Sequence, residues 1–156
     1  MLKKNTAMDY SISLRLPEGW LVESETYIDE SGAEVAHTCA TIPGKTGQDA
    51  LIDIYFGEMP EDDTAEDQAF VNYMETVGFS DDDPEDFNPV ERIKFNGKNA
   101  FCFDAICEGN APMKFISQEV KKGMLAIIVV VALNDNLLNE SMDLCERGFR
   151  VRKEGE

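Results

Sequence analysis

The stretch that decides the fold runs from Gly123 to Val151 and reads GMLAIIVVVALNDNLLNESMDLCERGFRV. Near its start lie ten consecutive apolar residues, Met124 to Leu133, a run too short to span a bilayer and rich in the β-branched types that favour strands. A strand that is apolar on both faces must be covered on both. We therefore expect this strand at the centre of a sheet, with other elements packed above and below it.

A helix is expected directly after this strand. Asn134 and Asp135 supply capping side chains at its start, and Gly148 is the expected stop at its end. The apolar residues of the segment follow one stripe of the helix: Leu137, Leu138, Leu144 and Cys145. An amphipathic helix of this kind is expected to cover one face of the sheet.

Three short turns organise the second half of the chain. Asn96-Gly97 is the strongest short-range hairpin signal, Gly109-Asn110 is another favoured two-residue turn, and Lys122-Gly123 is a third. They predict a four-strand antiparallel meander with strands at Val90 to Phe95, Lys98 to Cys107, Ala111 to Lys121 and Met124 to Leu133.

The turns also predict which side chains share a face, because a two-residue turn sets the register of the hairpin. One face is expected to carry Phe101, Phe103, Ile116, Val129 and Val131. The other is expected to carry Ile93, Ala100, Cys102, Ile106, Phe115, Ile128 and Val130. Each face is apolar enough to need a cover.

The first half of the chain contains further strand patterns. Strands are expected at Tyr10 to Leu16, at Ala33 to Ile42 and at Leu51 to Phe56, the last interrupted only by Asp53. Trp20 to Ile28 fits either a strand or a loop that lays Trp20 against the core, and the pattern does not choose between them.

A middle helix is expected between these strands and the meander. Thr64 is its expected N-cap and Gly78 its end. Its apolar face is expected to comprise Phe70, Val71, Met74 and Val77. Residues 1–156 are thus predicted to form a single α+β domain, an antiparallel sheet covered by the middle and the C-terminal helix.

The composition limits the classes of partner. The chain has 31 acidic and 14 basic residues and a formal charge of -17, which repels nucleic acid phosphates and anionic lipid surfaces. We expect no nucleic acid partner and no membrane span. Met1 to Asp9 has a basic start but no apolar segment behind it, so we expect a cytoplasmic protein. The four cysteines include no Cys-x-x-Cys pair, and reduced thiols are expected.

The order of elements resembles that of a known group. A first strand leading into Leu16-Pro17-Glu18-Gly19-Trp20, a middle helix, a long meander, and a last helix that ends in Gly148-Phe149-Arg150-Val151 resemble the Mog1/PsbP-like superfamily, including its bacterial DcrB-like members. The resemblance covers most of the chain. It implies an α/β/α sandwich and a non-enzymatic protein that binds or assists a larger partner, such as a GTPase, a photosynthetic complex or a secreted effector. It implies no catalytic residues, because this superfamily has no shared catalytic motif.

Two loops contain incomplete ligand motifs. Gly44-Lys45-Thr46 matches the end of a phosphate-binding loop, but Cys39 stands where that motif needs glycine, so a turn between strands is preferred. The acidic loop after the middle helix lacks the glycine and the final glutamate of a calcium loop. It is interpreted as a solvated segment, and also as a docking surface for a basic partner, formed by Asp81, Asp82, Asp83, Glu85 and Asp86.

Three residues carry the remaining chemical hypotheses. His37 and Cys39 share one strand face, as a base and a thiol nucleophile would, but the sequence identifies no acid partner. Asp104 interrupts an apolar strand and is expected to face Phe115; in that position it is either a perturbed carboxylate or a group exposed to water, and exposure is preferred. Zinc is not supported, since there is no second histidine.

The function expected from these observations is a non-enzymatic protein-binding module, an adaptor, chaperone or inhibitor with a strongly acidic surface and no cofactor. One alternative is a domain that holds a small apolar molecule between the sheet and a helix, with Trp20, Phe101 and Phe103 among its walls. A second alternative is a hydrolase that uses Asp104 or the pair His37 and Cys39. Convergence of His37, Cys39 and an acid is the observation that favours a hydrolase.

Overall fold

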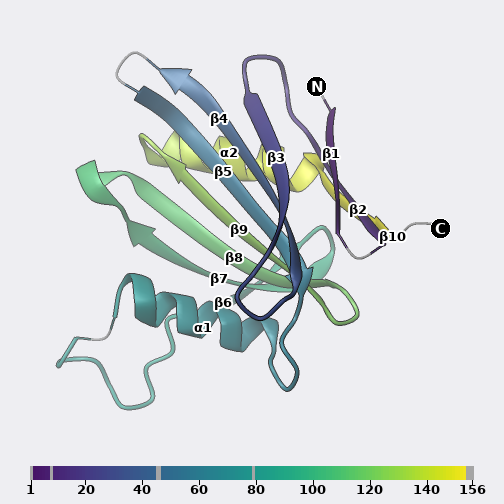
Figure 1. Cartoon of the computed structure of the whole chain (residues 1–156). Helices are drawn as coiled ribbons and strands as arrows, with labels where there is room; N and C mark the ends of the chain where they lie inside the picture. The colour runs from purple at the N-terminus through teal and green to yellow at the C-terminus, as the bar shows by residue number, and fades with distance from the viewer. Residues whose placement is uncertain (1, 8, 45–46, 79, 154–156) are drawn as a thin grey trace.

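A seven-stranded antiparallel sheet forms the middle layer of the molecule (Figure 1). The structure, a computed structural model, describes residues 2–7, 9–44, 47–78 and 80–153. From one edge to the other, the strands are β3 (Leu21–Ile28), β4 (Glu34–Gly44), β5 (Gly47–Glu58), β9 (Met124–Ala132), β8 (Pro112–Lys121), β7 (Lys98–Ile106) and β6 (Glu91–Phe95). The prediction that the apolar run forms the central strand is confirmed, because β9 is the fourth of the seven.

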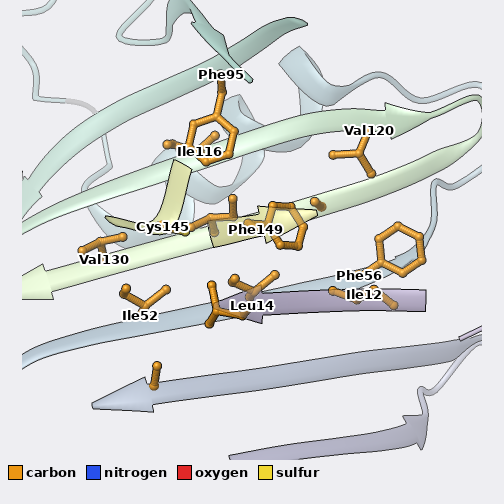
Figure 2. Close-up of a cluster of buried hydrophobic side chains, with 14 of the residues drawn as sticks. Ile12, Leu14, Ile52, Phe56, Phe95, Ile116, Val120, Val130, Cys145 and Phe149 are labelled. Atoms are coloured by element: carbon orange, nitrogen blue, oxygen red, sulfur yellow. The ribbon is translucent and has the colours of Figure 1, made fainter. Parts of the chain in front are cut away.

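A small three-stranded sheet and helix α2 (Asp135–Gly148) cover one face of the large sheet. The small sheet has the order β1 (Leu2–Ala7), β2 (Tyr10–Arg15) and β10 (Phe149–Lys153). Figure 2 shows the core between these layers, where side chains of the small sheet meet those of β5 and β9: Ile12, Leu14 and Phe149 with Ile52, Phe56 and Val130. β1 and β10 were not predicted, because their pairing with β2 joins the two ends of the chain.

The prediction for the C-terminal helix is confirmed. The Asn134 side chain accepts a hydrogen bond from Leu137 N at 2.8 Å, which caps the first turn of α2. Leu138, Ser141 and Cys145 are buried, and Leu137 and Leu144 are partly buried against the same core. The helix ends at Gly148 and β10 begins at the next residue.

Helix α1 (Ala65–Thr76) lies on the opposite face of the large sheet, where it packs on β7 and β8 (Figure 1). Its predicted N-cap is confirmed, since the Thr64 hydroxyl accepts a hydrogen bond from Asp67 N at 3.0 Å. Of its predicted apolar face, Phe70 is partly buried against the core beneath the helix, but the other three assignments are wrong. Ala65 and Ala69 are buried, whereas Val71, Met74 and Val77 are 48%, 40% and 49% exposed. Small residues face the sheet because the space beneath α1 is filled by large rings, among them Phe103 and Phe115.

The four-strand meander is confirmed, and so is the Asn96-Gly97 turn, with positive φ at both residues as a type I′ turn requires. The connection from β7 to β8 is longer than predicted. It includes a one-turn 3₁₀ helix, Glu108–Asn110, and a hydrogen bond from Cys107 N to Ala111 O. A second irregularity interrupts the pairing of β8 with β9 between Glu119 and Lys121.

These two irregularities shift β8 by one residue against both neighbours. The predicted faces of Phe115 and Ile116 are therefore exchanged: Phe115 pairs with Phe103 and Val129, on the α1 face. The assignments of β7 and β9 remain correct, because the two shifts cancel between them.

The segment left open between strand and loop is the strand β3, and Trp20 just before it is buried in the core on the α2 side. The turn predicted at Gly44-Lys45-Thr46 connects β4 to β5, and Gly44 itself belongs to β4, where it pairs with Gly47. Lys45 and Thr46 lie outside the described residues. The four cysteines are free thiols. None of the helices in the described part of the chain has the length and apolar character that crossing a bilayer would demand.

Candidate functional site

Half of the large sheet's α1 face is left open. α1 packs on β7 and β8, while the residues of β3, β4 and β5 on the same face are exposed or only partly buried. We call this surface the open face and define it by eight residues: Leu21, Glu23, Glu25 and Tyr27 of β3, His37 and Cys39 of β4, and Asp53 and Tyr55 of β5.

Strand pairing explains why these side chains lie together. Glu23, Cys39 and Asp53 are directly opposite one another on three adjacent strands. Glu25, His37 and Tyr55 form the next such row, two residues further along each strand. Residues in register on neighbouring strands point to the same face, so the two rows form one continuous grid.

His37 is at the centre of this grid. Its Nε2 lies 2.8 Å from Oδ1 of Asp53, and its Nδ1 lies 3.4 Å from Oε1 of Glu25. Its ring stacks on Tyr55 with a centroid distance of 4.3 Å and an angle of 5° between the planes. The imidazole is therefore held between two carboxylates and one aromatic ring.

The predicted pair of His37 and Cys39 does meet an acid, which is Asp53. The carboxylate contacts the imidazole and also hydrogen-bonds the thiol. Burial, and then the negative charge of Asp53 and its hydrogen bond, raise the pKa of the Cys39 thiol to about 11. A thiol with this pKa is protonated at neutral pH, whereas a cysteine nucleophile needs a lowered pKa.

The same environment affects Tyr55. Burial, followed by the charge of Asp53, raises the pKa of the Tyr55 phenol. The phenol therefore stays protonated and remains a hydrogen-bond donor near neutral pH. The open face thus presents protonated hydroxyl and thiol groups among carboxylates, an arrangement suited to binding.

Two grooves border the open face. One, of about 460 Å³, is lined by residues 22–25 of β3 together with His37 and Cys39. The other, of about 280 Å³, lies between the sheet and the start of α1 and includes Tyr27, Tyr55 and Gln68 in its lining.

The alternative of an apolar cavity walled by Trp20, Phe101 and Phe103 is not supported by their positions. Trp20 belongs to the core on the α2 side of the sheet, while Phe101 and Phe103 pack with α1 on the other side. The three side chains are therefore separated by the sheet itself and cannot line one cavity.

Asp104 does not face Phe115. With the corrected register it pairs with Lys114, whose Nζ lies 3.5 Å from its Oδ1, and its side chain is 71% exposed. It is a surface carboxylate in contact with a lysine, so the preferred interpretation of exposure holds and the hypothesis of a buried acid is wrong.

The acidic loop after α1 is at the surface. Asp81, Asp82, Glu85 and Asp86 are exposed. Asp83 is partly buried, and its Oδ2 accepts a hydrogen bond from Ser80 N at 2.8 Å. Among the described residues, no group of three or more His, Cys, Asp or Glu side chains is placed to hold a metal ion.

Sequence reasoning missed Glu25, Asp53 and Tyr55 as members of the site. Asp53 did give a signal, as the one polar residue in the apolar run from Leu51 to Phe56. The signal could not be connected to His37, because the partner strand of each residue is set by long-range pairing.

The fold defined by these layers is the Mog1/PsbP-like fold, which confirms the predicted architecture. The solution structure of cyanobacterial PsbP (CyanoP) from Synechocystis sp. PCC 6803 matches 97% of this chain and 92% of its own with a TM-score of 0.51. The identity of 16% supports a shared fold only. No protein-family model matches the chain, and no curated protein matches it by sequence.

Proposed function

We propose that this chain is a non-enzymatic protein-binding module and that the open face receives a basic segment of its partner. The observation that carries the proposal is the position of Glu23, Glu25 and Tyr27, which project in one row along the exposed edge strand β3. Carboxylates and aromatic rings on one surface suit arginine and lysine side chains, through ion pairing and cation–π contact.

The charge of the whole chain supports a basic partner. With a formal charge of -17, the protein attracts cationic surfaces and repels anionic ones during encounter. Such steering raises the association rate and is screened over about 8 to 10 Å at ordinary salt.

A second surface supports protein binding over a purely solvated exterior. Val71 and Met74 lie on the outer side of α1 and Val77 follows at its C-cap, and each of these residues is 40% to 49% exposed. A row of exposed apolar side chains on a helix is typical of contact surfaces.

The hydrolase alternative has one specific observation in its favour, the convergence of His37, Asp53 and Cys39. The raised pKa of the Cys39 thiol opposes it, because the thiolate is the reactive form. For this reason binding is the function that the open face supports best.

The test compares two variants with equal changes of charge. One carries Glu23→Gln and Glu25→Gln on the open face, and its control carries Asp81→Asn and Asp82→Asn in the acidic loop. Each is immobilised and exposed to lysate at low and at high salt, and captured proteins are quantified against wild type.

We expect a protein that wild type captures at low salt to be lost by the open-face variant and retained by the loop variant. Loss with the loop variant alone would assign docking to Asp81 to Asp86 and overturn the role of the open face. Equal capture by all three proteins would overturn docking through either acidic surface.

A further inference from the structure

Four of the five arginines in the chain line a single pocket. The pocket has a volume of about 390 Å³ and lies on the small sheet, at its junction with the end of α2. Its lining contains Arg15, Arg147, Arg150 and Arg152, together with Ser11, Ser13 and Gly148. In a chain with 31 acidic and 14 basic residues, this is a local reversal of charge.

Strand alternation explains how these side chains converge. Ile12 and Leu14 of β2 are buried in the core, so Ser11, Ser13 and Arg15 point outward. Arg150 pairs with Ser13, and Arg152 pairs with Ser11. The β10 arginines therefore point outward on the same face as the two serines.

The remaining arginine comes from α2. Arg147 is in the last turn of the helix, and Gly148 follows it against the backbone of Arg15. This close approach brings the end of α2 to the edge of the pocket.

Within the described part of the chain, no ion pair joins an acidic side chain to any of these four arginines. Arg147 donates a hydrogen bond to Asp143 O, and Arg150 donates to the carbonyls of Glu146 and Phe149 and to Asn96 Oδ1. Each guanidinium has five N–H donors, so both retain unused ones.

Capping of the helix does not account for the whole cluster. Hydrogen bonds to the last carbonyls of α2 are a structural role for Arg147 and Arg150. Arg15 and Arg152 make no side-chain hydrogen bond to any described residue, yet they line the same pocket. Among the described residues nothing occupies these two exposed guanidinium groups, so they are accessible to a ligand in the pocket.

The geometry points to a binding site for a small molecule with a multiply charged phosphate group. Guanidinium groups match phosphate oxygens bidentately, and the hydroxyls of Ser11 and Ser13 add neutral donors. A compact anion fits better than a nucleic acid, because the acidic remainder of the surface repels an extended polyanion.

The site is tested with inorganic pyrophosphate as the probe. The full chain, with any tag removed because β1 and β10 bring both ends of the described chain to the small sheet, is titrated at low salt. Calorimetry gives the Kd, and amide NMR shifts give the location. We expect saturable binding with shifts at Ser11, Ser13, Gly148 and Arg150.

The informative variant is Arg15→Gln with Arg152→Gln, since neither side chain makes a structural hydrogen bond to the described chain. It should weaken binding by ten-fold or more while the amide spectrum otherwise stays that of the folded protein. The matched control is Arg92→Gln with Lys94→Gln, which removes the same two positive charges from exposed positions of β6 outside the pocket and should leave the Kd unchanged. Binding that is absent, or that the control weakens as much as the pocket variant does, would overturn the proposal.

Two further probes test whether the ligand group is a phosphate and whether it belongs to a soluble molecule or to a lipid. Citrate that binds as tightly as pyrophosphate would overturn the assignment to phosphate. Phosphatidylcholine vesicles containing phosphatidic acid distinguish a soluble ligand from a lipid headgroup. We expect no sedimentation with these vesicles, and arginine-dependent sedimentation would overturn the assignment to a soluble molecule.

Discussion

Gly148 at the end of α2 lies directly against the backbone of Arg15 in β2, so close that a Cβ on Gly148 would overlap the Arg15 carbonyl oxygen. The atom in the way is backbone, and it cannot move without shifting β2. Gly148 was predicted as a helix stop, and α2 does end there. The structure adds a second reason for glycine at this position, the close packing of the helix end against a strand.

Gly148→Ala should therefore destabilise the protein. The overlap forces α2 and β2 apart, and overpacking of this kind costs about 1 to 3 kcal/mol of the free energy of unfolding. Urea denaturation measures the change. Glu140→Ala, at an exposed position of the same helix, is the control and should change the free energy of unfolding by less than about 0.5 kcal/mol. A Gly148→Ala protein as stable as wild type would contradict this close approach.

Val130→Asp should prevent soluble folding. Val130 is fully buried at the centre of β9, between Lys114 of β8 and Ile52 of β5 in register. A carboxylate at this position costs several kcal/mol even beside Lys114, because pairing in the interior does not offset the desolvation of the charges, and the total stability is only about 5 to 15 kcal/mol.

Soluble yield and circular dichroism provide the measurement for Val130→Asp. The matched control is Leu133→Asp, just beyond the same strand, where the side chain is 56% exposed. That protein should fold and melt close to wild type. If both variants fold equally well, β9 is not the central strand.

The parts of the fold that sequence could predict are those encoded by neighbouring residues. Asn96-Gly97 predicts a hairpin because both residues readily adopt the positive φ of a type I′ turn. Thr64 and Asn134 predict helix starts because their side chains can accept hydrogen bonds from backbone N–H groups of the first turn. The pairing of β5 with β9 has no such local signal, because it joins residues more than 60 positions apart. The boundary between the open face and the part of the sheet covered by α1 lies at this pairing, because β3, β4 and β5 are on one side of it and β9, β8 and β7 are on the other.

The face of α1 was misjudged for a related reason. Its larger apolar residues predicted the contact with the sheet, but the sheet presents rings that need small partners. The rings of Tyr73 and Phe103 pack edge to face with 5.3 Å between their centroids, and Ala69, one turn before Tyr73 in α1, is fully buried. The helix residues that can pack against the sheet are determined by side chains of strands distant in sequence. Which of those side chains face α1 follows only from the register of β8.

Gln118→Leu should destabilise the hairpin of β6 and β7. The buried Gln118 amide donates hydrogen bonds to Phe95 O at 2.8 Å and to Lys98 O at 3.3 Å, on either side of the Asn96-Gly97 turn. Leucine has a similar size but no donor, so it leaves the Phe95 carbonyl without that partner, at a cost of about 1 to 3 kcal/mol.

Thermal melting measures the effect of Gln118→Leu, and Ser141→Ala is its contrast. The Ser141 hydroxyl is buried and has no hydrogen-bond partner among the described residues, so its removal should leave stability unchanged or increase it. A destabilised Ser141→Ala together with a stable Gln118→Leu would reverse both assignments.

The stability of the protein should fall as the pH rises above 9, because of its buried thiols. Burial, with a smaller effect from Glu146, raises the pKa of Cys145 to about 12, and the Cys39 thiol has a pKa of about 11. In the unfolded chain a thiol ionises near 9.0. Between these values the unfolded state binds fewer protons than the folded state, so deprotonation favours unfolding.

The fully buried Cys145 should contribute a loss of about 1.4 kcal/mol per pH unit within this window, while the partly exposed Cys39 adds a smaller loss of the same sign. Urea denaturation at pH 8, 9, 10 and 11 measures the slope. Cys145→Ala is expected to be less stable than wild type at pH 8, because it loses buried volume, but to lose stability less steeply above pH 9. If the two proteins lose stability in parallel up to pH 11, ionisation of the Cys145 thiol does not drive the alkaline transition.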